Sequence, residues 1–291
     1  MTSFREALQS DRFTISAELT VRRDSNADDI RRQADRLAGL CDGIQVSDNP
    51  HAWVQMSALS AAGILIEHGA DPVPVLTCRD RNRLALHSDL LGLHALGVSS
   101  LLLMRGHRVP VGHSVPASTV FDLTGRELIA LANSISPAGS AGDSPFFIGT
   151  GARVFRPNRG WQADSLTARA AVGARFAQTQ LCFNTDILAQ YMKRFVAAGM
   201  DRRYALIVSL SPLPSVRTAR WVKKNLGDSR IPDRVFRRLE DAADPGAEGI
   251  RICAELMQEL SGIEGISGVN LMTTGDAEAI RAAISASGLR S

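Results

Sequence analysis

The stretch PVPVLTCRDRNRLALHSDLLGLHALGVSSLLLM, Pro72–Met104, contains the unit on which the fold is built. Two short apolar runs, Pro72–Thr77 and Ser99–Met104, enclose a segment with helical spacing, Asn82–Leu96. A continuous apolar run bounded by turns is typical of a strand that is covered on both faces, as in a parallel sheet. The stretch therefore predicts a strand–helix–strand unit with a parallel crossover.

The same alternation continues along the chain. Further strands are expected at Arg12–Leu19, Gly43–Ser47, Phe146–Thr150, Phe176–Leu181, Tyr204–Ser209 and Gly268–Met272. Helices are expected at Ala27–Leu40, Trp53–His68, Phe121–Asn133, Ser165–Ala174, Asp186–Ala198, Ser215–Leu226, Arg234–Ala242, Ala247–Leu260 and Asp276–Ser287. Eight strands without a dividing linker predict a single (β/α)8 TIM barrel over residues 1–291, with extra helices before strand eight. The alternative is an open doubly wound sheet, but the G-x-G-x-x-G fingerprint after the first strand is missing.

Composition excludes several classes of protein. The chain has 291 residues, 33 Lys+Arg against 30 Asp+Glu, and a net charge of +3, which provides no electrostatic footprint for nucleic acid. No apolar run reaches the ~18 residues of a membrane span. Charges in the N-terminal MTSFREALQS argue against a signal peptide. The four cysteines (Cys41, Cys78, Cys182, Cys253) form no C-x-x-C pair, so we expect reduced thiols and a cytoplasmic location.

Glu18 is the most informative polar residue at a strand end. Barrel enzymes build their active sites at the carboxyl ends of the strands, and Glu18 ends an otherwise uncharged strand. Burial would raise the pKa of this carboxyl towards neutrality and suit it for general acid catalysis. The alternative is a carboxylate at the rim that pairs with Arg105 or Arg22.

Arg105-Gly106-His107 follows the fourth strand. The glycine permits close approach of the backbone to a ligand, and the arginine suits a phosphate or carboxylate. His107 is either a titrating group of the site or a solvated loop residue. His107 and His113 lie six residues apart in this loop. The sequence offers no third metal ligand beside them, so no metal site is expected.

Gln180 and Arg169 are further candidates near the sixth strand. A buried glutamine amide must either cap backbone groups or read the edge of a ligand. Arg169 would serve a pyrophosphate, or else it is a solvated charge on a helix.

These residues together resemble the methylenetetrahydrofolate reductase family, with the reductase half of bifunctional homocysteine S-methyltransferase/methylenetetrahydrofolate reductases as the nearest likeness. The resemblance covers almost the whole chain, in family order. The matching pieces are Glu18, Ser47-Asp48-Asn49-Pro50, Leu76–Val98, VFDLTGRELIAL (Val120–Leu131), Gly173-Ala174, Thr179-Gln180, SPLPSVRTA (Ser211–Ala219), IPDRVFRRL (Ile231–Leu239) and GVNLM (Gly268–Met272).

The resemblance implies a cytoplasmic flavoprotein of one-carbon metabolism. Such an enzyme interconverts 5,10-methylenetetrahydrofolate and 5-methyltetrahydrofolate, with FAD at the barrel mouth and NAD(P)H as electron partner. Glu18 then matches the general acid, and His107 stands at a catalytic position. The expected FAD-binding residues are Ser47, Thr77, Asp80, Arg105, Gly106, His107, Ala152, Arg153 and Arg169, and the expected folate-binding residues are Glu18, Gln180 and Phe236.

Three departures from the family pattern lie near the expected site. His107 stands where the family has aspartate, Val75 where histidine is common, and Arg153-Val154-Phe155 where relatives carry Asn-Pro or Tyr-Pro. A carboxylate near the flavin opposes its anionic reduced form, so His107 in that place would raise the reduction potential and favour oxidation of methyl-folate.

The departures leave two alternatives open. One is an accessory, non-catalytic folate-binding barrel that works with a separate methyltransferase. The other is a flavin-free reductase in which hydride passes directly from the nicotinamide to the folate. Because relatives form dimers or tetramers, we also expect a homo-oligomer.

Overall fold

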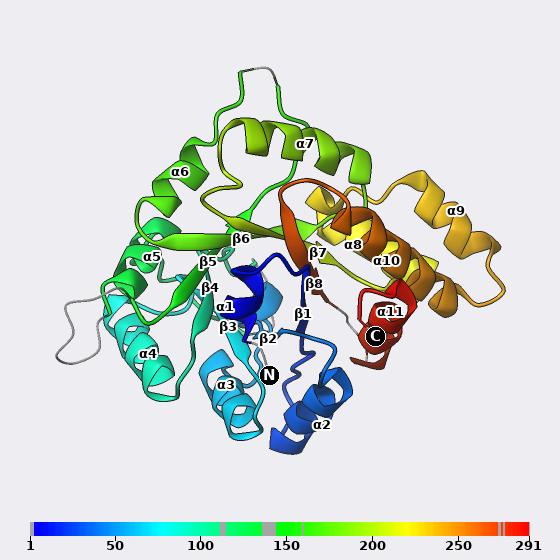
Figure 1. Ribbon diagram of the computed structural model, residues 1–291. Coiled ribbons are helices and arrows are strands. Elements are labelled where there is room, and N and C mark those ends of the chain that lie inside the picture. The colour runs from blue at the N-terminus through cyan, green and yellow to red at the C-terminus, as the bar shows by residue number, and fades with distance from the viewer. Residues whose placement is uncertain are drawn as a thin grey trace.

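The computed structural model describes residues 3–110, 115–135, 144–158, 160–272, 275 and 277–290. Eight parallel strands form a closed barrel in chain order, and the last strand pairs with the first (Figure 1). The strands are β1 (Thr14–Glu18), β2 (Gly43–Val46), β3 (Pro72–Thr77), β4 (Ser100–Met104), β5 (Phe147–Ala152), β6 (Ala174–Leu181), β7 (Ala205–Leu210) and β8 (Ile266–Leu271). The predicted TIM barrel is therefore confirmed, and the open sheet is excluded.

Helices surround the strands (Figure 1). They are α1 (Phe4–Leu8), α2 (Ala27–Leu37), α3 (Ala58–Glu67), α4 (Arg83–Ala95), α5 (Gly125–Asn133), α6 (Asp164–Ala170), α7 (Thr185–Ala197), α8 (Val216–Asn225), α9 (Asp233–Asp241), α10 (Pro245–Ser261) and α11 (Ala277–Ser287), with short 3-10 turns η1 (Pro50–Ala52) and η2 (Gly227–Ser229). The helices α8, α9 and α10 precede β8, so the extra helices are confirmed. In the described part of the chain, no helix has the length and apolar character needed to cross a membrane.

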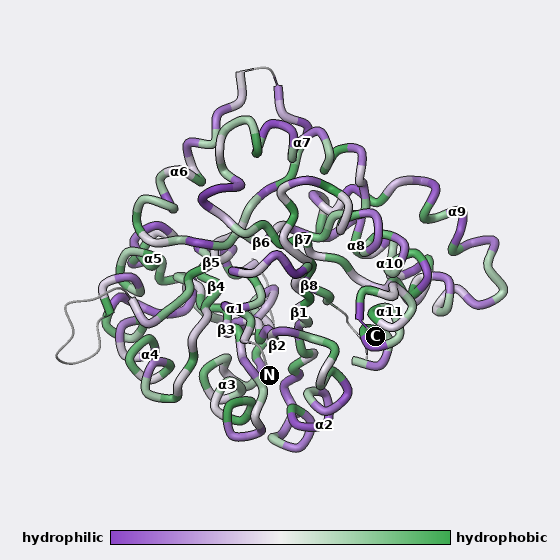
Figure 2. Tube along the Cα trace, in the orientation of Figure 1, coloured by the Kyte–Doolittle hydropathy of each residue, from purple (hydrophilic) through white to green (hydrophobic). Residues whose placement is uncertain are grey.

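Alternation along β1 separates the barrel interior from the layer beneath the helices. Ile15 and Ala17 belong to the large apolar core that the strands form with the helices. Ser16 points the other way, and its Oγ donates a hydrogen bond to Asn270 Oδ1 on β8, 2.9 Å away. Because side chains alternate with a period of two, Glu18 also points into the barrel. In Figure 2 the surrounding helices alternate hydrophobic and hydrophilic residues, as helices with one buried face do.

The N-terminal end of the barrel is closed by α1, which lies across the centre of the ring of strands in Figure 1. Phe4 of α1 meets Phe176 at a ring-centroid distance of 5.3 Å, and Phe147 stacks on Phe176 at 5.5 Å. Val75, one of the departures from the family pattern, is buried in this apolar cluster. Helix α1 was not predicted from the sequence, although Ser3 and Glu6 form a capping box that marks its start.

Two helices begin later than their patterns predict, because polar caps decide where they start. The predicted helix Trp53–His68 begins at Ala58, where Ser57 Oγ accepts the Ser60 N–H at 3.2 Å. The predicted helix Phe121–Asn133 begins at Gly125 after a capping box that Thr124 forms with Glu127. Trp53 and Phe121 consequently lie in loops near the carboxyl ends of the strands.

Candidate active site at the carboxyl ends of the strands

Glu18 is held by two neutral donors from β2 and the residue after it. Ser47 Oγ donates a hydrogen bond to Glu18 Oε1, and Gln45 Nε2 donates to Oε2 at 3.4 Å. Burial raises the pKa of the Glu18 carboxyl to about 7, and the Ser47 hydrogen bond opposes this rise. Among the described residues no arginine pairs with Glu18, since Arg105 instead lies over the ring of Phe121 at 4.3 Å. The carboxyl can therefore carry a proton near neutral pH.

Asp48 fixes Thr77, the residue on which the Arg105-Gly106-His107 turn packs. Its Oδ2 accepts the Thr77 N–H at 2.9 Å and the Thr77 hydroxyl at 2.8 Å, and it also pairs with Arg81. Gly106 passes directly above Thr77 at φ +79°, so that a Cβ at this position would lie 3.1 Å from Thr77 Cβ. Only glycine therefore fits this turn without strain.

Arg79 and Asp80 form an ion pair next to Thr77 in the sequence. The guanidinium of Arg79 contacts both Asp80 oxygens, from Nε at 2.7 Å and from Nη2 at 2.6 Å. Arg79 Nη2 also donates to the carbonyl oxygen of Asn49 at 3.0 Å, which ties the loop after β2 to the loop after β3. Asp80 is therefore at the mouth of the barrel, with its charge already paired.

A hollow of about 520 Å³ lies between the ends of β4 and β5 and the helices α5 and α6. Four of the predicted cofactor and catalytic residues line it, namely Arg105, Gly106, His107 and Arg169. Arg126, at the start of α5, adds a further guanidinium. The hollow therefore combines several cations with the amino end of a helix, which favours an anion.

Arg169 is the most informative of these cations. It donates to Thr150 Oγ1 at 2.8 Å, to the carbonyl of Gly151 at 2.6 Å, and to Ser165 O and Oγ at 3.0 and 3.1 Å. All of these acceptors are neutral, and within the described ranges no carboxylate pairs with Arg169. Burial lowers the pKa of its guanidinium. A bound anion would supply the missing charge partner.

Several predicted site residues use their polar groups elsewhere. Gln180 exchanges two hydrogen bonds with the backbone of Val154, at 2.9 and 2.8 Å, and its Nε2 also reaches the carbonyl of Asp228 at 3.3 Å. Arg153 pairs with the Asp228 carboxylate at 2.7 Å. Both residues therefore hold the η2 segment against the end of β5, and neither is joined to Glu18.

Two further predicted residues are Ala152 and Phe236. Ala152 is buried at the end of β5. Phe236 lies on α9, which is outside the ring of strands in Figure 1, and the ammonium of Lys223 sits 4.9 Å from its ring centroid. A role for Phe236 in folate binding stays a prediction.

The loop after β2 contains functional candidates that the sequence analysis missed. Asn49, His51 and Ala52 all have positive φ, of 45°, 55° and 65°. Strain of this kind in residues other than glycine often marks functional loops. His51 contacts Trp53 at a ring-centroid distance of 5.6 Å and Trp221 of α8 at 6.0 Å. The Asn49-Pro50 turn was the available signal, because it interrupts any helix there.

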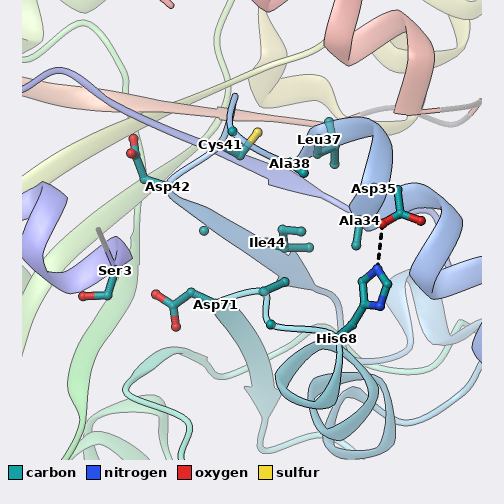
Figure 3. A pocket seen from close by; sticks show the side chains of 14 residues that line it. Ser3, Ala34, Asp35, Leu37, Ala38, Cys41, Asp42, Ile44, His68 and Asp71 are labelled. Atoms are coloured by element: carbon teal, nitrogen blue, oxygen red, sulfur yellow. Dashed lines mark hydrogen bonds and ion pairs between the residues drawn. The ribbon is translucent and has the colours of Figure 1, made fainter. Parts of the chain in front are cut away.

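A separate hollow of about 330 Å³ lies near the N-terminal ends of β2 and β3 (Figure 3). His68 and Asp35 meet there at 2.7 Å, and Asp71 accepts the Phe4 N–H at 2.7 Å. Asp42, also at its edge, accepts the Ile15 N–H and pairs with Arg290 at 2.5 Å. These groups join α1, α2 and the end of the chain to the barrel, at the opposite end from Glu18. His113 lies outside the described residues, and no group of three potential metal ligands gathers in the part that the structure describes.

Comparison with solved structures supports the fold. An uncharacterized protein from Clostridium thermocellum, described as binding two copies of 5-methyl-5,6,7,8-tetrahydrofolic acid, is 14% identical with a TM-score of 0.63, and the match covers 97% of this chain and 96% of that one. Ligand-free tryptophan synthase from M. tuberculosis is 11% identical, with a TM-score of 0.55 and full coverage of both chains. At these identities the likeness concerns the barrel alone. No curated protein matches the sequence.

The family comparison extends beyond the fold. The model of the family described as methylenetetrahydrofolate reductase matches residues 3–288, which is nearly the whole chain. The match does not distinguish the bifunctional homocysteine S-methyltransferase/methylenetetrahydrofolate reductases from other members, so the likeness to their reductase half stays a prediction. This match shows that the chain belongs to the methylenetetrahydrofolate reductase family of oxidoreductases.

Proposed function

We propose that this protein interconverts 5,10-methylenetetrahydrofolate and 5-methyltetrahydrofolate, with FAD as cofactor and NAD(P)H as electron partner. The observation that carries the proposal is Glu18, a carboxyl inside the barrel mouth with its pKa raised to about 7 by burial. Membership of the family supports the reaction class. The fold of the Clostridium thermocellum protein, which binds 5-methyltetrahydrofolate, supports the substrate class.

Glu18 supplies the proton in this reaction. In methylene-folate the one-carbon unit bridges two ring nitrogens, N5 and N10. Protonation of N10 by Glu18 lets the C–N10 bond break with its electron pair on nitrogen, and the carbon then accepts a hydride. In the reverse direction the carboxylate takes the proton back. A general acid with a pKa near the working pH serves both directions.

The hollow beside Arg169 fits the phosphates of FAD. Arg105, Arg126 and Arg169 supply positive charge, and the backbone at Gly106 leaves room where any other residue would project a Cβ. Bound there, FAD would supply two-electron hydride chemistry, which amino-acid side chains lack. We propose that Ser47, Thr77, Asp80 and Ala152 complete the cofactor site. Arg153 joins it only when its pair with Asp228 opens.

His107 biases the proposed direction of the reaction. It is exposed at the edge of the same hollow, in the place of a family aspartate. Without that carboxylate, the reduced flavin faces less negative charge and is easier to form. We therefore infer that the enzyme favours oxidation of methyl-folate. Oxidation of methyl-folate would allow the enzyme to work with a separate methyltransferase. On the family resemblance we also propose that the protein is a homo-oligomer and that it is cytoplasmic.

One observation favours the accessory-barrel alternative. Gln180 and Arg153, both expected at the ligand, are engaged with Val154 and Asp228. A barrel that kept these contacts would hold folate weakly and serve a separate methyltransferase. The flavin-free alternative keeps Glu18 as the acid and dispenses with the hollow beside Arg169.

Anaerobic mixing of the purified protein with 5-methyltetrahydrofolate tests these readings together. We expect a yellow protein whose flavin band near ~450 nm bleaches on mixing, because electrons pass from the folate to the cofactor. A colourless protein that oxidises NAD(P)H only when methylene-folate is present would establish the flavin-free enzyme. A colourless and inert protein would establish the accessory barrel.

A further inference from the structure

The segment of residues 50–54, here called the strap, follows β2 and reaches across the end of the barrel to α8. The ring of His51 meets the ring of Trp221 on α8 at a centroid distance of 6.0 Å, with the ring planes 82° apart. Helix α8 follows β7, and in the closed barrel β8 and β1 stand between β7 and β2. The contact therefore spans the ends of two strands, and one of them, β1, ends at Glu18.

On its other side, His51 faces the loops that follow β3 and β4. Burial lowers the pKa of its imidazole, and repulsion from His107 and Arg79 lowers this pKa further. Arg79 comes two residues after the end of β3, and His107 comes three residues after the end of β4. Because Trp221 lies on the opposite side, these neighbours place the His51 ring over the opening of the barrel.

Hydrogen bonds anchor the strap at both ends. Gln55, directly after it, donates from Nε2 to the carbonyl of Ser47 at 2.7 Å and from its N–H to Asn49 Oδ1 at 3.2 Å. Within the strap, the Ala52 N–H donates to the carbonyl of Asn49 at 2.9 Å and closes a short turn. The strap can therefore move as one unit about two fixed ends.

Two features of the strap oppose the position that it occupies. The backbone is strained, because His51 and Ala52 have positive φ of 55° and 65° without being glycine. The strap also leaves two large apolar side chains in solvent, with Trp53 59% exposed and Val54 49% exposed. The contact with Trp221 favours the same position. Opposing contributions of this kind are expected of an element with two arrangements.

A hollow beside the strap provides room for a second arrangement. It measures about 310 Å³, and Trp53 and Val54 line it together with Val21 from the loop after β1. Rotation of the strap about its fixed ends would carry Trp53 into this hollow, against Val21, and would take His51 away from Trp221. The lifted strap would then bury apolar surface that is exposed in the present position.

We propose that the strap is a lid, which closes the mouth of the ligand-free barrel through the contact of His51 with Trp221 and lifts to admit folate to Glu18. The identity of the entering ligand rests on the proposed function. Lifting that precedes binding limits the rate of association, so this rate should reach a plateau as the folate concentration rises. The contact with Trp221 slows lifting, whereas backbone strain at Ala52 speeds it. The two effects can therefore be changed separately.

The first experiment follows binding of 5-methyltetrahydrofolate to the purified full-length protein by stopped-flow fluorescence, with the Kd from calorimetry. The variants are Trp221→Ala, Trp221→Phe and Ala52→Gly. Leu91→Ala is the control for loss of an exposed apolar side chain, since Leu91 lies on α4 and is 51% exposed. Ala198→Gly is the control for the added glycine, because Ala198 is exposed and its φ of −83° carries no such strain.

The variants should act in opposite directions. Trp221→Ala removes the closing contact, so the plateau rate should rise about two- to tenfold and the Kd should fall. Trp221→Phe retains an aromatic ring and should behave nearly as the wild type does. Ala52→Gly accepts the positive φ without strain and stabilises the closed lid, so the plateau rate should fall roughly fivefold. Both controls should match the wild type.

The second experiment needs no ligand. The Trp53 N–H donates to the carbonyl of Pro50 at 3.0 Å in the closed strap, and lifting exposes this N–H to solvent. Its hydrogen exchange in the ligand-free protein should become faster in Trp221→Ala and slower in Ala52→Gly, because exchange reports the population of the lifted strap. This measurement does not depend on the proposed function.

The other outcomes separate the lid from the proposed function. Unchanged exchange in Trp221→Ala would overturn the closing contact. Altered exchange with an unaltered rate of folate association would show a strap that moves without acting as a lid. A shift in the same direction in Trp221→Ala and Ala52→Gly would also overturn the proposal. Exchange that changes as expected in a protein that binds no folate would support the closing contact and remove the proposed function.

Discussion

The Ser47 hydroxyl donates a hydrogen bond to Oε1 of Glu18 across the pairing of β2 with β1. This bond stabilises the ionised carboxylate, whereas burial destabilises it. The pKa of about 7 is the balance of these two effects, with burial the larger. Ser47 therefore sets how far into the neutral range Glu18 keeps its proton.

Replacing Ser47 with alanine should raise the pKa of Glu18 further, because the effect of burial is then opposed only by the longer hydrogen bond from Gln45. The pH at which kcat for methylene-folate reduction declines should rise by about one unit, equivalent to ~1.4 kcal/mol. The pH profile of kcat measures this shift. Ser88→Ala, on the exposed side of α4, is the control. An unshifted profile in Ser47→Ala would show that the hydroxyl does not tune the acid.

Glu18→Gln should change how stability depends on pH. The raised pKa of Glu18 means that the folded state holds the proton more tightly than the unfolded chain does. This contribution to stability is fully present below pH 4.5, the ordinary pKa of the group, and is lost as the pH rises through about 7. Urea unfolding of the apoprotein at several pH values measures it. Relative to the variant, the wild type should lose about 2–3 kcal/mol of unfolding free energy between these limits. A pH-independent difference would refute the raised pKa.

Arg169→Met should weaken FAD binding by about ten- to a hundredfold, because the variant lacks the guanidinium that would pair with the phosphates. Arg169→Lys should retain most of the affinity, since lysine keeps the positive charge. Equilibrium quenching of flavin fluorescence measures both. Arg175→Met is a suitable control, because Arg175 is exposed and donates to the backbone carbonyls of Ala170 and Ala174. Equal FAD affinity in the wild type and Arg169→Met would place the phosphates elsewhere.

Gly106→Ala should destabilise the protein more than Gly39→Ala does. Both glycines have positive φ, +79° and +75°, but a Cβ at Gly39 meets open space, whereas at Gly106 it lies 3.1 Å from Thr77 Cβ. Strain alone costs about 1 kcal/mol at Gly39, and the contact should add about 1–2 kcal/mol at Gly106. Unfolding free energies of the two variants provide the comparison. Equal losses of unfolding free energy in the two variants would show that Thr77 can move away from the added Cβ without destabilising the protein.

His107→Asp should lower the flavin midpoint potential, because a carboxylate near the cofactor opposes its anionic reduced form. A change of 1.4 kcal/mol corresponds to roughly 30 mV in a two-electron couple, and we expect a shift of this order at an exposed position. Dye-equilibrated reductive titration measures it, with His107→Asn to separate the loss of imidazole from the gain of charge. If the aspartate and asparagine variants have the same potential, charge at this position does not set the direction of the reaction.

Much of the architecture was predictable because strands in a parallel barrel are continuous apolar runs. The Pro72–Thr77 strand is correct at both ends, and the alternation along β1 already places Ser16 and Glu18 on one face. Errors arose where a polar cap outweighed apolar periodicity, as at Ser57 and Thr124. The apolar stripe continues through such a cap, so the stripe alone cannot mark where a helix begins.

The sequence by itself determined the order of the strands, the residues at their carboxyl ends and the family to which the chain belongs. Local spacing decides these features. Only the tertiary structure decided that Glu18 meets Ser47, that Arg169 donates to Thr150, and that Gln180 is engaged with Val154. Each of these depends on which side chains from distant parts of the chain reach the same point. Burial and the choice of hydrogen-bond partner, which set the pKa and the available charge, are properties of the closed barrel and not of any segment of it.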